Sequence, residues 1–363
     1  MQNHGKHEKE ITKQATKQIG LIKNQDRQKK DDVILMSHGD GGLKSSELIS
    51  SVISKHIKND ILDRFEDSAV MRLPGKKIAF TTDSFVINPI FFPGGDIGSL
   101  AVYGTINDLS VCGARPLFLS VGIVMEEGLE LSALRRITAS IGIAAKASGV
   151  KIVTGDTKVV ERGSCDKVFI NTSGIGEIYY PGLSASRIKA GDSVIVSGPI
   201  GDHAISVLSK REGLDFGTKV RSDSAPLDSL IGKVLGASKK VHFMRDPTRG
   251  GVATTLNEMA EGNSFGIAID EKAVPVREGV RQACELLGMD PLYLACEGRA
   301  LIIAAGEDEA RILRALRGAK EGRLAAVIGT VTKEHKGKVY LNTVAGGKRI
   351  VDMLSSEQLP RIC

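Results

Sequence analysis

Two hydrophobic periodicities alternate along most of the chain. Short runs of aliphatic and β-branched residues predict buried strands, and longer runs with apolar residues three and four apart predict helices. Strands are expected at 78–82, 116–124, 150–153, 168–176, 193–196 and 292–305, the last interrupted at 296–299. Helices are expected at 100–112 and 131–148, with one more that begins near residue 44 and another that ends near residue 260. The similar strand–turn–helix content of the two halves predicts an α+β chain with two sheet-containing lobes and a site between them.

Breaks in this pattern divide the chain into four parts. Residues 1–32 are rich in Lys and Gln and are expected to be a disordered or loosely attached basic extension, or a helix that forms only on a partner. The turn at 180–182 separates a first domain, 33–182, from a second, 183–350. Residues 351–363 are expected to form a mobile tail.

Composition narrows the class of protein. Hydrophobic residues make up 42% and charged residues 25% of the 363, as in soluble globular proteins. No apolar run is long enough for a membrane span, and the five scattered cysteines argue against a disulfide framework or a structural zinc site, as expected of a cytoplasmic protein. The net charge of +6 is weak evidence for any partner, and the absence of Trp makes a stacking platform for nucleic acid improbable.

Several aspartates stand among apolar residues. Asp83, Asp96 and Asp108 lie in the apolar stretch 81–116, and Asp156 follows a later strand. Carboxylates in such surroundings are usually paired or bound to metal, and oxygen ligands with waters and phosphates suit Mg²⁺. The alternative is that Asp83 and Asp96 cap helices and that Asp108 meets an arginine.

Phosphate-binding groups are expected nearby. The glycine-rich loop at 37–42 exposes successive backbone N–H groups that can close over phosphate, although it lacks a Walker ending and such a loop alone is usually only a turn. Lys158 is directed at phosphate or pairs with Asp156. Arg249 holds phosphate bidentately or pairs with Asp246 across its turn. His203 is interpreted most simply as a residue at the start of a helix.

Two further residues are candidates for chemistry. Glu297 is either a general base with a pKa tuned by burial or the partner of Arg299 in a structural pair. Cys363 is the last residue of the sequence, so it is either an ordinary surface thiol or a carrier that can be loaded elsewhere and swung into a site. Prenylation is excluded, because that signal needs the cysteine four residues from the end.

These motifs together resemble the HypE family of hydrogenase maturation proteins, which are ATP-dependent carbamoyl dehydratases. The family lies within the wider group of aminoimidazole ribonucleotide synthetase, selenophosphate synthetase and thiamine-phosphate kinase. The resemblance runs from about residue 35 to the end, and the related synthetases and kinases lack the PRIC tail. It rests on SHGDGG, TTDSFVINPIFFPGGDIGSLAVYGTINDLSVCGARP, TGDTKVVERG, VSGPIGDHAI, RDPTRGGVATTLNE, EGRA and PRIC.

The resemblance implies a two-domain aminoimidazole ribonucleotide synthetase-like fold and a chemistry. A carbamoyl group on Cys363 would be dehydrated with ATP to an S-cyano group, with Glu297 or Lys158 as the base. The four aspartates would hold Mg²⁺. The residues expected to bind the nucleotide are Gly39, Asp40, Gly41, Gly42, Asp83, Asn107, Asp108, Thr154, Gly155, Asp156 and Arg249.

Partners follow from the same resemblance. A HypF-like carbamoyltransferase would load the thiol, and a HypC–HypD pair would receive the cyanide for the iron of NiFe hydrogenase. A homodimer would form through the first domain. The rival interpretations are a synthetase or kinase of the same superfamily that acts on a free small molecule, and a non-catalytic assembly scaffold whose nucleotide only sets conformation.

Overall fold

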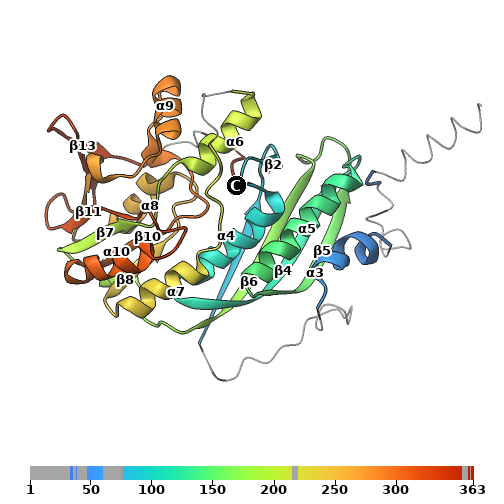
Figure 1. The fold of residues 1–363 in the computed structure, drawn as a ribbon, viewed down its shortest axis with the longest axis horizontal. Helices are drawn as coiled ribbons and strands as arrows, with labels where there is room; N and C mark the ends of the chain where they lie inside the picture. Colours follow the sequence, from blue (N-terminus) through green and yellow to red (C-terminus); the bar gives the residue numbers. More distant parts are fainter. Residues whose placement is uncertain are drawn as a thin grey trace, which may run out of the picture.

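The computed structural model describes residues 33–35, 38, 47–59, 75, 77–214, 220–353, 359 and 361–363. The predicted N-terminal extension and the glycine-rich loop, Gly39, Asp40, Gly41 and Gly42, lie outside these residues. The described chain folds into two lobes, each built on its own sheet, with the C-terminus between them (Figure 1).

The first lobe is a four-stranded sheet with helices on one face (Figure 1). Its strand order is β1-β6-β4-β5, in which only the β4–β5 pair is parallel. A two-stranded ribbon, β2–β3, precedes the first long helix. The elements are η2 (Ile49–Ile53), α3 (Ser54–Ile57), β1 (Ile78–Phe85), β2 (Phe91–Phe92), β3 (Gly95–Asp96), α4 (Ile97–Val111), β4 (Ala114–Glu126), α5 (Leu131–Ala147), β5 (Lys151–Val160) and β6 (Val168–Ile178).

The two faces of this sheet differ. Alternate residues of β4, such as Leu119, Val121 and Ile123, are buried in a core shared with α4 and α5. The even-numbered residues of β1 point to the other face, where Ile78 is 50% and Phe80 is 67% exposed. One face of the sheet therefore lies open in the single chain, and it carries large apolar side chains.

The second lobe is a seven-stranded sheet with helices on both faces. Its order is β13-β12-β9-β11-β7-β10-β8, antiparallel except for β9–β12. The elements are η4 (Ala185–Arg187), β7 (Asp192–Val196), α6 (Asp202–Glu212), α7 (Asp228–Ala237), β8 (Val241–Arg245), α8 (Gly251–Ala260), β9 (Gly266–Asp270), η5 (Glu271–Ala273), α9 (Glu278–Leu287), η6 (Pro291–Tyr293), β10 (Leu301–Ala305), η7 (Gly306–Asp308), α10 (Glu309–Arg317), β11 (Ala326–Thr332), β12 (Val339–Asn342) and β13 (Lys348–Val351).

Burial on both faces explains the continuous apolar sequence of the central strands. Within β7, Val194 and Val196 pack with α8, whereas Ile195 packs with α7 and α10. Every residue of β7 and of β10 is buried. Strands covered on both faces have no solvent side to keep polar.

The lobes meet along an apolar contact made by α6 and α9. Ala204 and Ile205 of α6 and Val280 of α9 belong to the same buried cluster as the first-lobe core, together with Ile362 of the tail. This shared core brings the loops of the second lobe beside the edge strand β1.

The predicted elements are largely confirmed, with extensions and one error. The expected helix at 100–112 is α4, while β1 and β5 run further than predicted, so that Asp83 and Asp156 lie within strands. The interruption expected at 296–299 is confirmed, but the strand expected before it is wrong: η6 (Pro291–Tyr293) and a loop precede β10, which begins at Leu301. There Gly298 lies so close to the main chain of Asp223 that a Cβ would meet Asp223 O at 1.8 Å, and this contact replaces sheet pairing.

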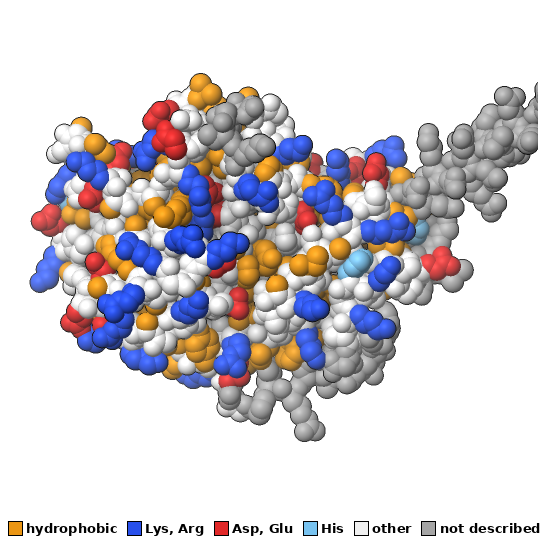
Figure 2. All heavy atoms as spheres, in the orientation of Figure 1, with side chains coloured by type: hydrophobic (Ala, Val, Ile, Leu, Met, Phe, Trp, Pro, Cys, Tyr) orange, Lys and Arg blue, Asp and Glu red, His pale blue; other side chains and the backbone are white. Residues whose placement is uncertain are grey.

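In the described part of the chain, no helix is long and apolar enough to cross a bilayer. Lys and Arg side chains are spread over both lobes on the face seen in Figure 2, with acidic and apolar residues between them. The positive charge does not gather into one patch on that face.

Candidate active site between the lobes

The first lobe contributes two carboxylates. Asp83 of β1 lies on the face covered by α4, where Gly104 leaves room for it: a Cβ on Gly104 would lie 3.3 Å from Asp83 Oδ2. Asp108 of α4 accepts a 2.8 Å hydrogen bond from the hydroxyl of Thr81. Burial raises the pKa of Asp83 to about 6, with a further contribution from Asp108, and burial also raises the pKa of Asp108.

The second lobe adds two more acids. Asp246 follows β8, and its pKa is raised to about 7, first by burial and then by the charges of Asp108 and Asp83. Glu297 is 2% exposed, and its pKa is raised well above the usual range by burial and then by Asp246, Asp223 and Asp83. The Glu297 Oε1 atom is buried and has no hydrogen-bond partner within the described residues. Acids from both lobes therefore share one poorly solvated region.

The tail reaches this region. A cavity of about 450 Å³ is lined by Thr82, Asp83, Ser84, Val86, Arg249, Arg361, Ile362 and Cys363. A hydrogen bond with the side chain of Cys363 partly offsets the raised pKa of Glu297. The structure thus brings together five of the predicted site residues: Cys363, Glu297, Asp83, Asp108 and Arg249.

Arg249 lies in the loop before α8. It is exposed, and its positive charge lowers the pKa of Asp83, which opposes the larger effect of burial. Gly250, at φ 71°, forms the N-cap of α8 and turns the chain into the helix. Arg249 is therefore a positive group at the mouth of the acidic region.

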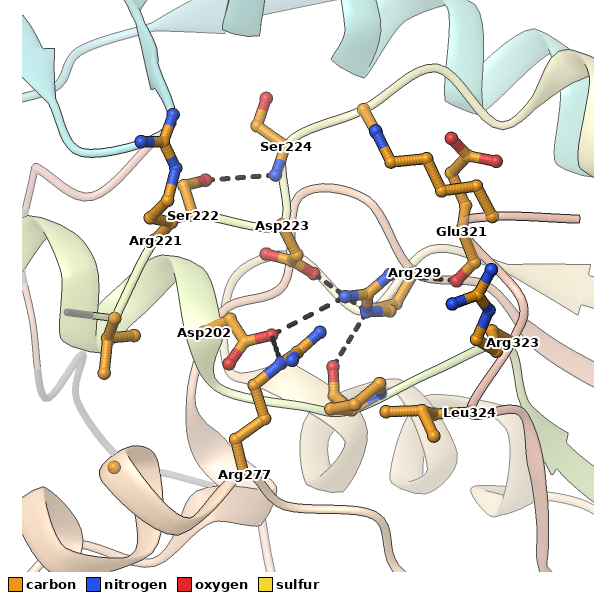
Figure 3. A pocket seen from close by; sticks show the side chains of 15 residues that line it. Asp202, Arg221, Ser222, Asp223, Ser224, Arg277, Arg299, Glu321, Arg323 and Leu324 are labelled. Atoms are coloured by element: carbon orange, nitrogen blue, oxygen red, sulfur yellow. Dashed lines mark hydrogen bonds and ion pairs between the residues drawn. The ribbon is translucent and has the colours of Figure 1, made fainter. Parts of the chain in front are cut away.

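Arg299, two residues after Glu297, lies between Asp202 and Asp223 (Figure 3). Its guanidinium pairs with Asp223 at 3.3 Å and with Asp202 at 3.6 Å, and so the alternative of a Glu297–Arg299 pair is not what the structure contains. The other oxygen of Asp223 accepts a hydrogen bond from the backbone N–H of Glu297 at 3.3 Å. Arg277 joins the cluster through a 2.9 Å contact with Asp202. This ion cluster fixes the main chain of Glu297.

Asn107 plays a similar part from the first lobe. Its amide donates to the carbonyl oxygens of Ala225 and Glu297, at 3.1 and 3.2 Å, and accepts from the backbone N–H of Leu227 at 2.8 Å. The side chain is 1% exposed, and its hydrogen bonds tie α4 to the Glu297 loop. Nucleotide binding by Asn107 stays a prediction.

Asp96 is not part of the acidic region. Its Oδ1 caps α4 by accepting from the backbone N–H groups of Gly98 and Ser99, at 2.9 and 3.1 Å, and its Oδ2 accepts from the Ser140 hydroxyl at 2.5 Å. The helix-capping alternative therefore describes Asp96 in the structure.

Asp156 and Lys158 also lie elsewhere. They pair with each other at 3.3 Å on β5, and their side chains are 72% and 65% exposed. Strand β5 is at the opposite edge of the sheet from β1, and Thr154, Gly155 and Asp156 belong to the same strand. Across the sheet, Asp156 pairs with Gly122 of β4, Gly122 with Asn171 of β6, and Asn171 with Ser84 of β1. Paired residues point to the same face, so Asp156 lies on the open face with Ser84. Asp83, the neighbour of Ser84, lies on the helix-covered face.

Sequence reasoning missed several residues at the site. Asp246 was considered only as a partner for Arg249, although its position after a strand was the same signal that selected Asp83. His203 does begin a helix, but its ring is fully buried and contacts the tail. Asp202 and Asp223 had no signal that separated them from surface acids.

Comparisons with known proteins agree with this architecture. The chain matches the family model described as AIR synthase related protein, N-terminal domain, over residues 65–178, and the corresponding C-terminal domain over 189–342. It is 49% identical to carbamoyl dehydratase HypE of Azotobacter vinelandii, over 90% of this chain and 96% of that protein.

Two solved structures extend the comparison. Hydrogenase maturation protein HypE in complex with ATP has a TM-score of 0.87 and 49% identity, covering 91% of this chain and 99% of that one. HypE in a HypE–HypF complex has a TM-score of 0.74 and 46% identity, covering 85% and 99%.

The fold and the paired domains place the protein in the AIR synthase-related class, so the expected two-domain fold is confirmed. Within that class, the chain belongs to the HypE family of carbamoyl dehydratases involved in hydrogenase maturation.

Proposed function

We propose that this chain uses ATP to dehydrate an S-carbamoyl group on Cys363 to an S-cyano group. The observation that carries the proposal is the hydrogen bond between Cys363 and the buried Glu297, in a region that Asp83 and Arg249 also border. The name carbamoyl dehydratase, given to relatives such as that of Azotobacter vinelandii, supports the same reaction.

The reaction requires an amide oxygen to become a leaving group. The carbamoyl oxygen forms a bond to the γ-phosphorus of ATP, and the bond from that phosphorus to the bridging oxygen of ADP breaks. The carbon–oxygen bond then breaks, phosphate departs with the former amide oxygen, and the nitrogen loses both protons. In sum, S-carbamoyl and ATP give S-cyano, ADP, phosphate and one proton.

Glu297 is the proposed base for a nitrogen proton. It adjoins the sulfur that would carry the substrate, and its Oε1 has no partner in the described part of the chain. Burial and the neighbouring acids raise its pKa, so the ionised carboxylate is a stronger base than that of a surface glutamate. Lys158, the other candidate, faces away from this region in its own chain, so it can serve the site only from a second subunit.

Asp83 and Asp108 fit a magnesium ion that also binds phosphate. Their raised pKa values reflect burial, which outweighs the opposing charges of Arg249 beside Asp83 and Arg245 beside Asp108. No three acidic, His or Cys side chains among the described residues form a complete metal cage, but Mg²⁺ that carries a nucleotide commonly uses only one or two carboxylates. Bound there, the ion would neutralise charge on the transferred phosphoryl group. Arg249 would contact the same group.

We further propose that a HypF-like carbamoyltransferase loads Cys363 and that a HypC–HypD pair receives the cyanide for the iron of NiFe hydrogenase. The solved HypE–HypF complex supports the first partner. A cytoplasmic location suits the chemistry, because a carrier cysteine must remain a free thiol before loading.

We also propose a homodimer through the open sheet face of the first lobe. Exposed Ile78 and Phe80 would be buried there, and Asp156 and Lys158 on the same face would lie at the subunit interface. This arrangement would allow Asp156 and Lys158 to reach a nucleotide bound by the other subunit.

Mass spectrometry of the C-terminal peptide tests the function. The protein is incubated with a carbamoyl donor, a HypF-like partner and ATP, with Cys363→Ser as the matched control. We expect ATP-dependent loss of one water from the carbamoylated peptide. A kinase acting on a free small molecule would consume ATP equally in both proteins, and a scaffold would leave the carbamoyl peptide unchanged; either result would reject the proposal.

A further inference from the structure

The last residues of the chain are held by their main chain. Cys363 O accepts a 3.0 Å hydrogen bond from Val86 N, and Arg361 O accepts from Asn88 N at 3.2 Å. Between them, Ile362 forms an antiparallel bridge with Ile87. The tail therefore adds a very short strand beside the segment that follows β1, a mode in which backbone bonds supply affinity and side-chain pockets supply specificity.

Two side chains of α6 also hydrogen-bond to the main chain of the tail. His203 Nε2 lies 2.7 Å from Ile362 O, and the Arg211 guanidinium donates to Arg361 O at 2.6 Å. The same guanidinium donates to Asn88 O at 2.6 Å, so that it bridges the tail and the strand beside it. A main-chain oxygen of each of residues 361–363 thus accepts a hydrogen bond.

The hydrogen-bond network assigns the tautomer of His203. The Ser222 hydroxyl oxygen accepts from Ser224 N at 3.0 Å, and the same hydroxyl lies 2.8 Å from His203 Nδ1. Ile362 O can only accept, so Nε2 carries the proton that is donated to it. In the neutral ring Nδ1 is then an acceptor, and the Ser222 hydroxyl donates to it. Burial lowers the pKa of His203, which favours this neutral form, and Phe92 packs edge-on against the ring.

Side-chain recognition is concentrated on Ile362. Its side chain is 3% exposed and belongs to the core between the lobes. Arg361 pairs with Asp166 at 2.7 Å, but both side chains are partly exposed, so this pair contributes little. The contacts that define the register of the tail are therefore the main-chain bonds and the buried Ile362.

We propose that His203 and Arg211 are positioning residues: their hydrogen bonds to the main-chain oxygens of Ile362 and Arg361, here called the grip, set how far Cys363 reaches toward Glu297. The inference rests on the proposed function of Cys363. Because the grip engages carbonyl oxygens and leaves the sulfur untouched, it holds the thiol, S-carbamoyl and S-cyano forms alike. The correct register matters, since a one-residue slip turns a side chain to the other face of a strand.

The test separates docking from chemistry. Alkylation of Cys363 by iodoacetamide, followed at the level of the peptide, reports release of the tail and requires no catalysis. Water loss from the pre-carbamoylated chain after addition of ATP reports the chemical step. We compare Arg211→Ala, His203→Leu and the rescue variant His203→Gln, whose amide can still donate. The control is Lys210→Ala, which removes a cation of α6 that has no hydrogen bond or ion pair with 361–363 among the described contacts.

We expect Arg211→Ala and His203→Leu to speed alkylation about tenfold, as loss of one strong hydrogen bond allows, and to slow water loss by a similar factor. His203→Gln should restore much of both, and Lys210→Ala should change neither. An unchanged rate of alkylation in both Arg211→Ala and His203→Leu would show that these side chains do not hold the tail, and would overturn the proposal. Faster alkylation with an unchanged rate of water loss would overturn the positioning role. Absence of water loss in the wild type would instead reject the proposed function and leave the alkylation result to stand alone.

Discussion

Glu297 and Cys363, from distant parts of the sequence, form a hydrogen bond between their side chains, and Glu297 is almost fully buried. The thiol comes from the tail and the carboxyl from an irregular loop before β10. Ion pairs of Arg299 and hydrogen bonds of Asn107 hold that loop from two sides. The pairing gives a carrier sulfur and a candidate base a common location.

Replacement of the base should separate chemistry from nucleotide binding. We expect Glu297→Gln to slow water loss from carbamoylated Cys363 by roughly 10²–10⁴-fold, the usual contribution of a general base, and to leave ATP affinity within a few-fold. Single-turnover mass spectrometry and nucleotide titration measure the two quantities. A variant with wild-type rates would remove Glu297 from the mechanism.

The acidic region predicts an unusual pH dependence of stability without nucleotide. The pKa of Asp246 is about 7 in the folded chain against an ordinary 3.8. The native state therefore keeps a proton that the unfolded state has lost, so stability falls as pH rises from about 4 to about 7. The penalty is complete above that range, and a shift from 3.8 to about 7 corresponds to roughly 4 kcal/mol.

Asp246→Asn tests this by denaturant unfolding at pH 5 and pH 8. We expect the variant to lose less stability than the wild type between the two values, because it has no proton to release there. Glu285→Gln removes an acid from the exposed side of α9 and serves as the control. Equal losses in all three proteins would contradict the assigned cause.

Asp83 and Asp96 looked alike in the sequence and should behave differently. Asp96→Ala should lower the free energy of unfolding by about 1–2 kcal/mol through loss of the α4 cap, with the Mg²⁺ dependence of ATP turnover unchanged. Asp83→Asn should weaken that Mg²⁺ dependence with little loss of stability, since it removes a buried charge. The opposite pattern would assign metal binding to Asp96.

The open sheet face predicts an oligomer. Phe80→Asp should shift the protein toward monomer in light scattering, because a charge would replace a 67% exposed apolar side chain at the proposed interface. Leu286→Asp, which changes an exposed apolar residue of the other lobe, should not. A monomeric wild type would contradict the dimer and would leave Lys158 without a route to the site.

Local pattern predicted the four long strands of the first lobe, its two long helices and β7, but left most other elements of the second lobe unassigned. Motif resemblance grouped Asp83, Asp108, Glu297 and Cys363 in one expected site. Pattern and resemblance could not decide between functions that use the same residue type, as with Asp96, whose second carboxylate oxygen is held by Ser140 from another helix. They also gave no sign of which face of β5 carries Asp156. The loop before β10 resembled a strand because its residues are apolar, but the close contact of Gly298 with Asp223 overrides that pattern.

The route of the carbamoyl oxygen tests the central claim most directly. The chain is loaded at Cys363 with carbamoyl labelled with ¹⁸O and mixed with unlabelled ATP, and the released phosphate is analysed by mass spectrometry. The account predicts one ¹⁸O atom in phosphate for each S-cyano group formed. Formation of S-cyano with the label in water and none in phosphate would contradict it.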